Sequence, residues 1–163
     1  LSEERVSTRH IARDLVMKGT AEQLRHVPSR MVTIGIQRRE SHLSDKLLAS
    51  GLELGAETEN AVYAVAAFQD EWILRRMVDR GVDINTGNHT VMRQLMNRGM
   101  PEAAECLVKC GADVEGFLQT EGYDGKRAGS PVFIRTIRYT FEMVRQAEQV
   151  GSDPSTDPAM DFK

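Results

Sequence analysis

The residue types most often used for catalysis and metal binding are sparse in this chain. The histidines stand far apart, with no metal-like spacing and no neighbouring cysteine: His10, His26, His42 and His89. Cys106 and Cys110 are four residues apart on one predicted helix, which favours buried thiols. Segment 122–126 is too short for a phosphate-binding loop and follows no predicted strand. The sequence therefore predicts no enzyme and no cofactor or metal, and a zinc site built from distant segments is the weaker alternative.

A pattern repeats around the glycines. Two large hydrophobic residues stand three and four positions ahead of Gly51, Gly81 and Gly111, which follow one another at intervals of 30 residues. Gly19 precedes Gly51 by 32 residues and is preceded by the same pattern. A fixed period of this length is typical of stacked-repeat proteins. The clearest copy, 90–115, predicts a helix, a glycine turn, a second helix and a glycine stop.

These copies resemble the ankyrin repeat. Segments 77–85 (MVDRGVDIN) and 107–114 (LVKCGADV) are similar to the ending L-L-x-x-G-A-D-V-N of that family. The opening T-P-L-H is never intact, since only Pro131 stands at its second position. The turn between the two helices falls at Gly99, and equivalent places hold Arg39, Gln69 and Tyr139. The resemblance implies an all-α, ankyrin-like helical solenoid of about four to five stacked helix-turn-helix repeats with short fingers.

The spacing divides the chain into a repeat domain, 1–152, and a tail, 153–163, which we expect to be disordered or a linker because it is rich in Pro, Ser and Asp. We expect a half repeat at 1–19 with a left-handed stop at Gly19, and then a finger at 20–29. Full repeats are predicted at about 30–54, 60–85, 90–115 and 130–151, with an inserted finger at 116–129. Repeat 60–85 is the expected centre of the core, because its first helix is small and densely apolar.

Composition limits the class of partner. The formal net charge of −3 argues against a broadly basic nucleic-acid binder, and no apolar run is long enough to cross a bilayer. The low cysteine content favours a reducing, intracellular compartment, either cytoplasm or nucleus. Because the first residue is Leu1, we expect the chain to be part of a longer protein. A monomer is the favoured oligomeric state.

In the ankyrin family, the ends of the first helices line a concave groove that binds partners. The ninth positions of the four copies are Arg38, Phe68, Arg98 and Arg138. Nearby positions add Asn97 and Ile137, and His89 precedes one of the helices. Guanidinium groups bind carboxylates and phosphates bidentately. The resemblance thus implies a groove for an acidic or phosphorylated peptide, with Phe68 as its apolar anchor. The alternative is that these arginines are simply solvated.

Three further hypotheses compete with this one. The inserted finger, which carries Tyr123, is either a tolerated surface insertion or a second binding surface. Trp72, expected near Tyr63 and Glu71, could join an aromatic cluster that reads methylated lysine. A tryptophan that fills a gap between neighbouring helices is the more common case. Finally, the stack could act as a structural spacer, or dimerise through the apolar face left open at its N-terminal end.

Overall fold

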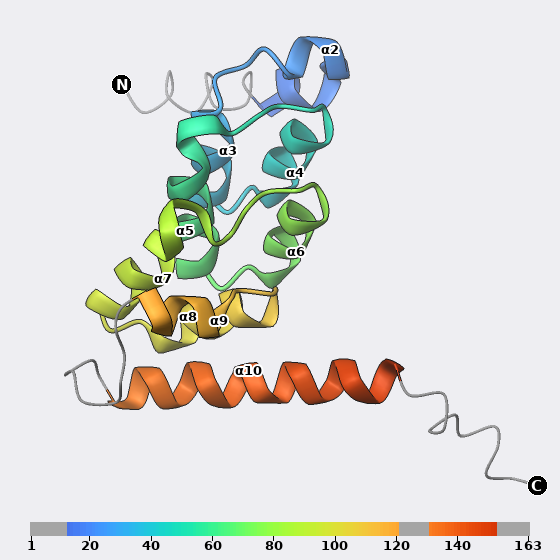
Figure 1. Ribbon diagram of the computed structural model, residues 1–163. Helices are drawn as coiled ribbons and strands as arrows, with labels where there is room; N and C mark the ends of the chain where they lie inside the picture. Colours follow the sequence, from blue (N-terminus) through green and yellow to red (C-terminus); the bar gives the residue numbers. More distant parts are fainter. Residues whose placement is uncertain (1–12, 121–130, 153–163) are drawn as a thin grey trace, which may run out of the picture.

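The computed structural model describes residues 13–120 and 131–152, which form helices and no strand (Figure 1). Residues 13–18 are helical. No helix in these two ranges is both long and apolar enough to span a membrane. The remaining elements are α2 (Ala21–Leu24), α3 (Arg30–Gln37), α4 (Ser41–Ala49), the 3₁₀ helix η1 (Gly55–Glu57), α5 (Thr58–Ala67), α6 (Glu71–Asp79), α7 (Thr86–Asn97), α8 (Pro101–Lys109), α9 (Val114–Thr120) and α10 (Pro131–Ser152).

The helices form two rows. In the first row α5 packs between α3 and α7, while in the second row α4 packs against α6 (Figure 1). Each first-row helix also packs against the helix that follows it, which gives the pairs α3 with α4, α5 with α6 and α7 with α8. The long helix α10 closes the end of the stack by packing on α8 and α9. The connections after Gly51 and Gly81 are short, as the prediction of short fingers implies.

The turns inside the helix pairs repeat with the sequence period. Arg39, Gln69 and Gly99 have φ angles of 62°, 54° and 63°, so all three are left-handed. In each case the amide of the next residue donates to the carbonyl oxygen five residues earlier, the bond that closes a Schellman motif. Gly51, Gly81 and Gly111, with φ angles of 89°, 86° and 100°, are likewise left-handed and follow the ends of the second helices. The turn positions predicted for these three pairs are confirmed.

The turn at Gln69 yields a prediction about stability. A non-glycine residue in the left-handed region costs about 1 kcal/mol, and within residues 13–120 and 131–152 the exposed Gln69 side chain makes no hydrogen bond that offsets this cost. We expect Gln69→Gly to raise the free energy of unfolding by about 0.5–1 kcal/mol, measured by urea denaturation. Gly99→Ala should lower it by a similar amount. A loss of stability in Gln69→Gly, as a glycine within a helix causes, would contradict this assignment.

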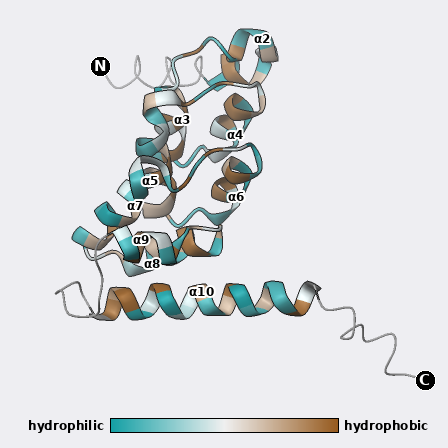
Figure 2. Ribbon diagram, viewed as in Figure 1, coloured by the Kyte–Doolittle hydropathy of each residue, from teal (hydrophilic) through white to brown (hydrophobic). Residues whose placement is uncertain are grey.

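The core is continuous and centres on α5. Its residues Ala61, Val62, Val65 and Ala66 have no exposed surface, and Ile73, Leu74 and Met77 of α6 are equally buried. Small residues on α5 allow neighbouring helices to approach closely. Hydrophobic segments occur in both rows, whereas α10 alternates between hydrophobic and hydrophilic segments (Figure 2). The central place predicted for repeat 60–85 is therefore confirmed.

The last predicted repeat, 130–151, is wrong in its internal structure. We predicted two helices joined by a turn at Tyr139, but α10 runs unbroken through that residue. Its buried residues Phe133, Ile134, Ile137 and Thr140 keep the spacing of one helical face. The prediction counted ten positions into this copy, but here one buried face continues on both sides of Tyr139, so the segment stays a single helix. The period therefore does not extend into this segment.

The inserted finger, predicted at 116–129, is also wrong in its first part. Residues 114–120 form α9, which packs on α7 as α10 packs on α8. Asp113 begins this helix, because its Oδ1 accepts from the Gly116 amide at 2.9 Å. The side chains of Val114 and Phe117 are then buried on one face of α9. Tyr123 and the remaining finger residues lie outside the described ranges.

The N-terminal part departs from expectation in two places. The left-handed stop predicted at Gly19 is wrong, because the φ angle of this residue is not positive. Its amide instead continues the helical pattern by donating to the Leu15 carbonyl oxygen. The predicted finger 20–29 contains the single turn α2, which begins with a capping box between Thr20 and Gln23. Residues 1–12 of the predicted half repeat, and the tail 153–163, lie outside the described residues.

Candidate peptide-binding groove

A groove of about 630 Å³ runs across the first row of helices. It spans α3, α5 and α7, so three consecutive helix pairs contribute to it. Its walls combine two aromatic rings with amides and guanidinium groups: Arg30, Gln37, Asn60, Tyr63, Phe68, Gln94 and Arg98. Side-chain amides can both donate to and accept from a peptide backbone. The lining thus offers hydrogen-bond donors and acceptors from all three helices.

Arg98 is held in place at one end of the groove. Its Nη1 donates to the Tyr63 hydroxyl at 2.7 Å, and its guanidinium carbon lies 5.0 Å from the centre of the Tyr63 ring. The Tyr63 hydroxyl in turn donates to Met100 Sδ at 3.6 Å. Within residues 13–120 and 131–152, no carboxylate pairs with Arg98. Only one of its five N–H groups bonds to Tyr63, so the others can bind an anionic ligand.

Phe68 is less accessible than the sequence suggested. The ring is half-buried at the C-terminal end of α5, and the Arg39 guanidinium carbon lies 4.1 Å from its centre. Arg39 therefore covers one face of Phe68 through a cation–π contact. The ring still lines the groove, but it acts as part of the wall and not as a protruding anchor.

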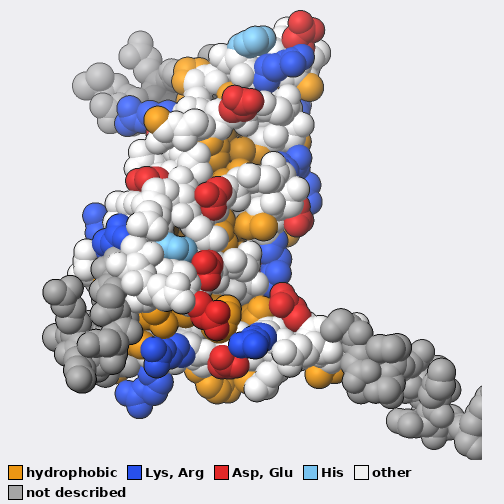
Figure 3. Space-filling model, in the orientation of Figure 1, with side chains coloured by type: hydrophobic (Ala, Val, Ile, Leu, Met, Phe, Trp, Pro, Cys, Tyr) orange, Lys and Arg blue, Asp and Glu red, His pale blue; other side chains and the backbone are white. Residues whose placement is uncertain are grey.

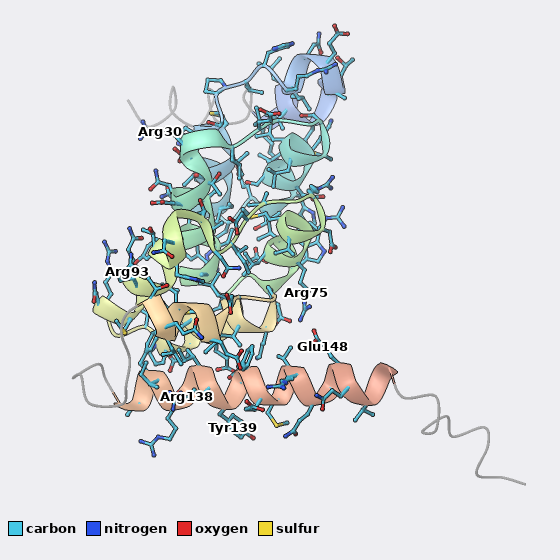
Figure 4. The ribbon with its side chains drawn as sticks, viewed as in Figure 1. Arg30, Arg75, Arg93, Arg138, Tyr139 and Glu148 are labelled. Atoms are coloured by element: carbon cyan, nitrogen blue, oxygen red, sulfur yellow. The ribbon has the colours of Figure 1, made fainter. Side chains whose placement is uncertain are left out.

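A single carboxylate lies at the opposite end of the groove. Glu57 accepts from Thr33 Oγ1 at 2.7 Å and from Asn60 Nδ2 at 3.4 Å. Arg30 also lines the groove and projects outward from α3 (Figure 4). The charged residues that line the groove are therefore two cations, Arg30 and Arg98, and one anion, Glu57.

The arginine ladder predicted from the sequence does not form as a row. Arg38 and Asn97 are exposed at the ends of α3 and α7 but do not line the groove. Ile137 is 0% exposed, because it packs into the core from α10. Arg138 lies on the side of α10 that faces away from the stack (Figure 4). Of the eight predicted residues that lie in the described ranges, Phe68 and Arg98 alone are brought together in the groove.

His89 is also placed away from the groove. It belongs to a left-handed turn with Gly87 and Asn88, whose φ angles are 62°, 57° and 65° in chain order from Gly87 to His89. This turn directs the imidazole against Phe117 of α9, with ring centres 6.2 Å apart. Asn88 Oδ1 accepts from Thr120 Oγ1 at 3.5 Å, so the turn also binds the end of α9. His89 thus contacts α9 and does not line the groove with Phe68 and Arg98.

Trp72 lies on α6, in the second row, and its ring contacts differ from those predicted. The ring is tilted by 56° against His42, with ring centres 5.1 Å apart, and the Arg76 guanidinium carbon lies 5.2 Å from its centre. Tyr63, the expected neighbour, contacts Arg98 in the groove instead. Arg76 thus already fills the position that a methylated lysine would take over the tryptophan ring. This geometry disfavours the methyl-lysine hypothesis.

An ion-pair cluster beside Trp72 fixes Arg76. Asp45 of α4 accepts from Arg76 Nε at 2.7 Å and from Arg80 Nη2 at 3.0 Å. Burial raises the pKa of the Asp45 carboxyl, but the hydrogen bonds to the two guanidinium groups outweigh it, and the net pKa is lowered. The cluster joins α4 to α6, which makes it a structural contact between repeats.

The cysteines are buried, as predicted. Both are free thiols on or just after α8. A hydrogen bond to Cys110, together with burial, raises the pKa of the Cys106 thiol. Cys106 is therefore protonated at neutral pH and poorly suited to act as a nucleophile. No group of three or more potential metal ligands occurs among the described residues.

Arg30 and Tyr63 are among the groove residues that were not predicted from the sequence. Tyr63 is the fourth residue of the predicted first helix, one turn before Ala67 and Phe68. Residues spaced by three or four positions share one face of a helix, so Tyr63 lies on the same face as Ala67, which also lines the groove. Arg30 is the first residue of its helix, and the equivalent positions of the other copies hold different residue types, so the sequence pattern did not single it out. Comparisons with protein-family models, curated proteins and solved structures find no match to this chain.

Proposed function

We propose that this chain is a divergent, ankyrin-like helical solenoid that binds an acidic or phosphorylated peptide in the groove across α3, α5 and α7. The observation that carries the proposal is Arg98, which Tyr63 orients while most of its donors remain available to a ligand. Orientation in advance lowers the entropic cost of binding. The binding is non-enzymatic, and the buried free thiols fit an intracellular protein.

The solenoid part of the proposal is supported by regularity in both sequence and structure. The second helices α4, α6 and α8 begin at residues 41, 71 and 101 and end at residues 49, 79 and 109. Their ends are followed by left-handed glycines at the same interval. Each pair therefore repeats the previous one with a shift of 30 residues, and a groove shared by three equivalent helices follows from this repetition.

Charge reversal tests the binding site. Peptides selected from a displayed random library against the native protein should be enriched in Asp and Glu. The Arg30→Glu/Arg98→Glu variant is expected to bind the best selected peptide about 100-fold more weakly, since two attractive charges become repulsive. Affinity is measured by fluorescence anisotropy, and circular dichroism and the Tm check the fold.

Arg38→Glu is the matched control. Arg38 is an exposed arginine near the same row of helices, but it does not line the groove. Its reversal should change the affinity by less than about threefold, because only long-range screened charge is altered. If Arg38→Glu weakens binding as much as the double variant, or if selection yields no acidic peptides, the proposed groove is wrong.

A further inference from the structure

The outer face of α10 is unusually hydrophobic for the end of a stack. Residues 13–120 and 131–152 expose seven large hydrophobic side chains, and four of them lie on α10. Val132, Tyr139 and Met143 are 55%, 68% and 50% exposed. Tyr139 points away from α8 and α9 (Figure 4), and hydrophobic side chains reach the surface along the edge formed by α10 (Figure 3). A terminal repeat normally presents a polar outer face, so this stripe requires an explanation.

The spacing of the stripe is that of a coiled coil. Val132, Thr136, Tyr139 and Met143 follow one another by four, three and four residues, which is the a/d spacing of a heptad. The inner face of the same helix, with Phe133, Ile134 and Ile137, is already used against α8 and α9. Helix α10 thus has one hydrophobic face that packs on the stack and a second that is directed outward. We call the second face, formed by Val132, Thr136, Tyr139 and Met143, the seam. Its spacing fits another helix of the same kind.

Charges beside the seam indicate which helix that is. Arg135 and Glu142 are exposed on one flank of the seam, both at the g position of the heptad. Neither has an ion-pair partner within the described residues. In an antiparallel pair of α10 helices, g positions face g positions, so Arg135 meets Glu142 of the second copy twice by symmetry. A parallel pair would place Arg135 opposite Thr140 and form no such contact.

We propose that two copies of this chain associate through the outer faces of α10, packed antiparallel with Val132 against Met143 and Thr136 against Tyr139 of the second copy. The contact is small, so its dissociation constant falls in the micromolar range. Because α10 lies across the end of the stack, beside α8 and α9, it leaves α3 and the peptide groove accessible. The dimer therefore presents two grooves at once. This proposal differs from the expectation of a monomer and does not depend on the proposed peptide.

Sedimentation velocity of the full 163-residue chain tests the association, over concentrations up to about 200 µM. The native chain should shift toward a dimer as its concentration rises. Tyr139→Glu/Met143→Glu should remain a monomer across the range, because it places four carboxylates in the seam. Leu15→Glu is the matched control, since Leu15 is 67% exposed at the opposite end of the stack. It should leave the dimer intact, with circular dichroism confirming the fold of each variant.

Charge exchange tests the antiparallel register. Arg135→Glu or Glu142→Arg alone should weaken association about tenfold, since each puts like charges opposite one another twice, and the double exchange should restore it. A monomeric native chain, or a dimer that Leu15→Glu breaks and Tyr139→Glu/Met143→Glu does not, would overturn the interface. Equal weakening in the two single variants and the double exchange would overturn the register.

Discussion

Phe117→Ala is expected to lower the free energy of unfolding by about 4 kcal/mol. Phe117 has no exposed surface, and its ring projects from α9 against His89. Truncation removes its hydrophobic burial and leaves a cavity that the surrounding helices, α7 and α10 among them, cannot fill completely. Urea denaturation followed by circular dichroism measures the change.

Leu118→Ala is the matched control for this variant. Leu118 is the next residue on α9 and is only half-buried. Its truncation should cost about 1–2 kcal/mol, clearly less than that of Phe117. A loss below about 1 kcal/mol in Phe117→Ala would mean that 114–120 is a surface loop, as the predicted finger at 116–129 implied.

Gly35→Leu is expected to cost about 3 kcal/mol. Gly35 is buried where α3 crosses α4, and a Cβ at this position would collide with Ser44 Oγ. The Ser44 hydroxyl cannot turn away freely, because it donates to the Val32 carbonyl oxygen at 2.7 Å. The larger side chain would therefore push the two helices apart and lose core contacts.

The equivalent positions in the other pairs suggest how to rescue this variant. Thirty and sixty residues further along, the same crossing holds Val65 with Leu74 and Leu95 with Ala104. Gly35→Leu/Ser44→Ala gives the first pair the residues of the third. Its loss of stability should be smaller than the sum of the two single losses by about 1 kcal/mol or more, because the colliding hydroxyl is absent. Additive losses would show that the two residues are not in contact.

The repeated part of the fold could be predicted because its signals are local. The glycine after each second helix, and the residue at each turn, stand within a few positions of the hydrogen bonds that end the helix. Left-handed geometry follows at Gly51, Gly81 and Gly111. Arg39 and Gln69 lack the flexibility of glycine, yet they adopt the same geometry because helix packing on both sides requires it. Spacing was thus a better guide than residue type.

The C-terminal part could not be predicted from the period. Gly116 favours a loop by composition, but Asp113 accepts its amide hydrogen and Phe117 buries the next turn, so tertiary packing outweighs the local preference. Likewise, nothing near Tyr139 interrupts α10. The same error affected the candidate site. Ile137 and Arg138 were assigned to the groove by counting into a segment that forms one long helix and not a helix pair.

The residues that line the groove could be predicted only in part. Phe68 and Arg98 follow from the period, whereas the contact between Arg98 and Tyr63 joins residues 35 positions apart on different helices. The distance between those helices, and therefore the contact, depends on how closely α5 and α7 pack. A single sequence gives no direct measure of that distance.

Amide chemical shifts of the ¹⁵N-labelled chain, titrated with the best selected acidic peptide, test the central claim most directly. The proposal predicts that the largest shifts occur on α3, α5 and α7, among residues such as Asn60, Tyr63 and Gln94, and that α4 and α6 shift little. Largest shifts around Trp72 and His42 on the second row, or on α10, would contradict binding in this groove.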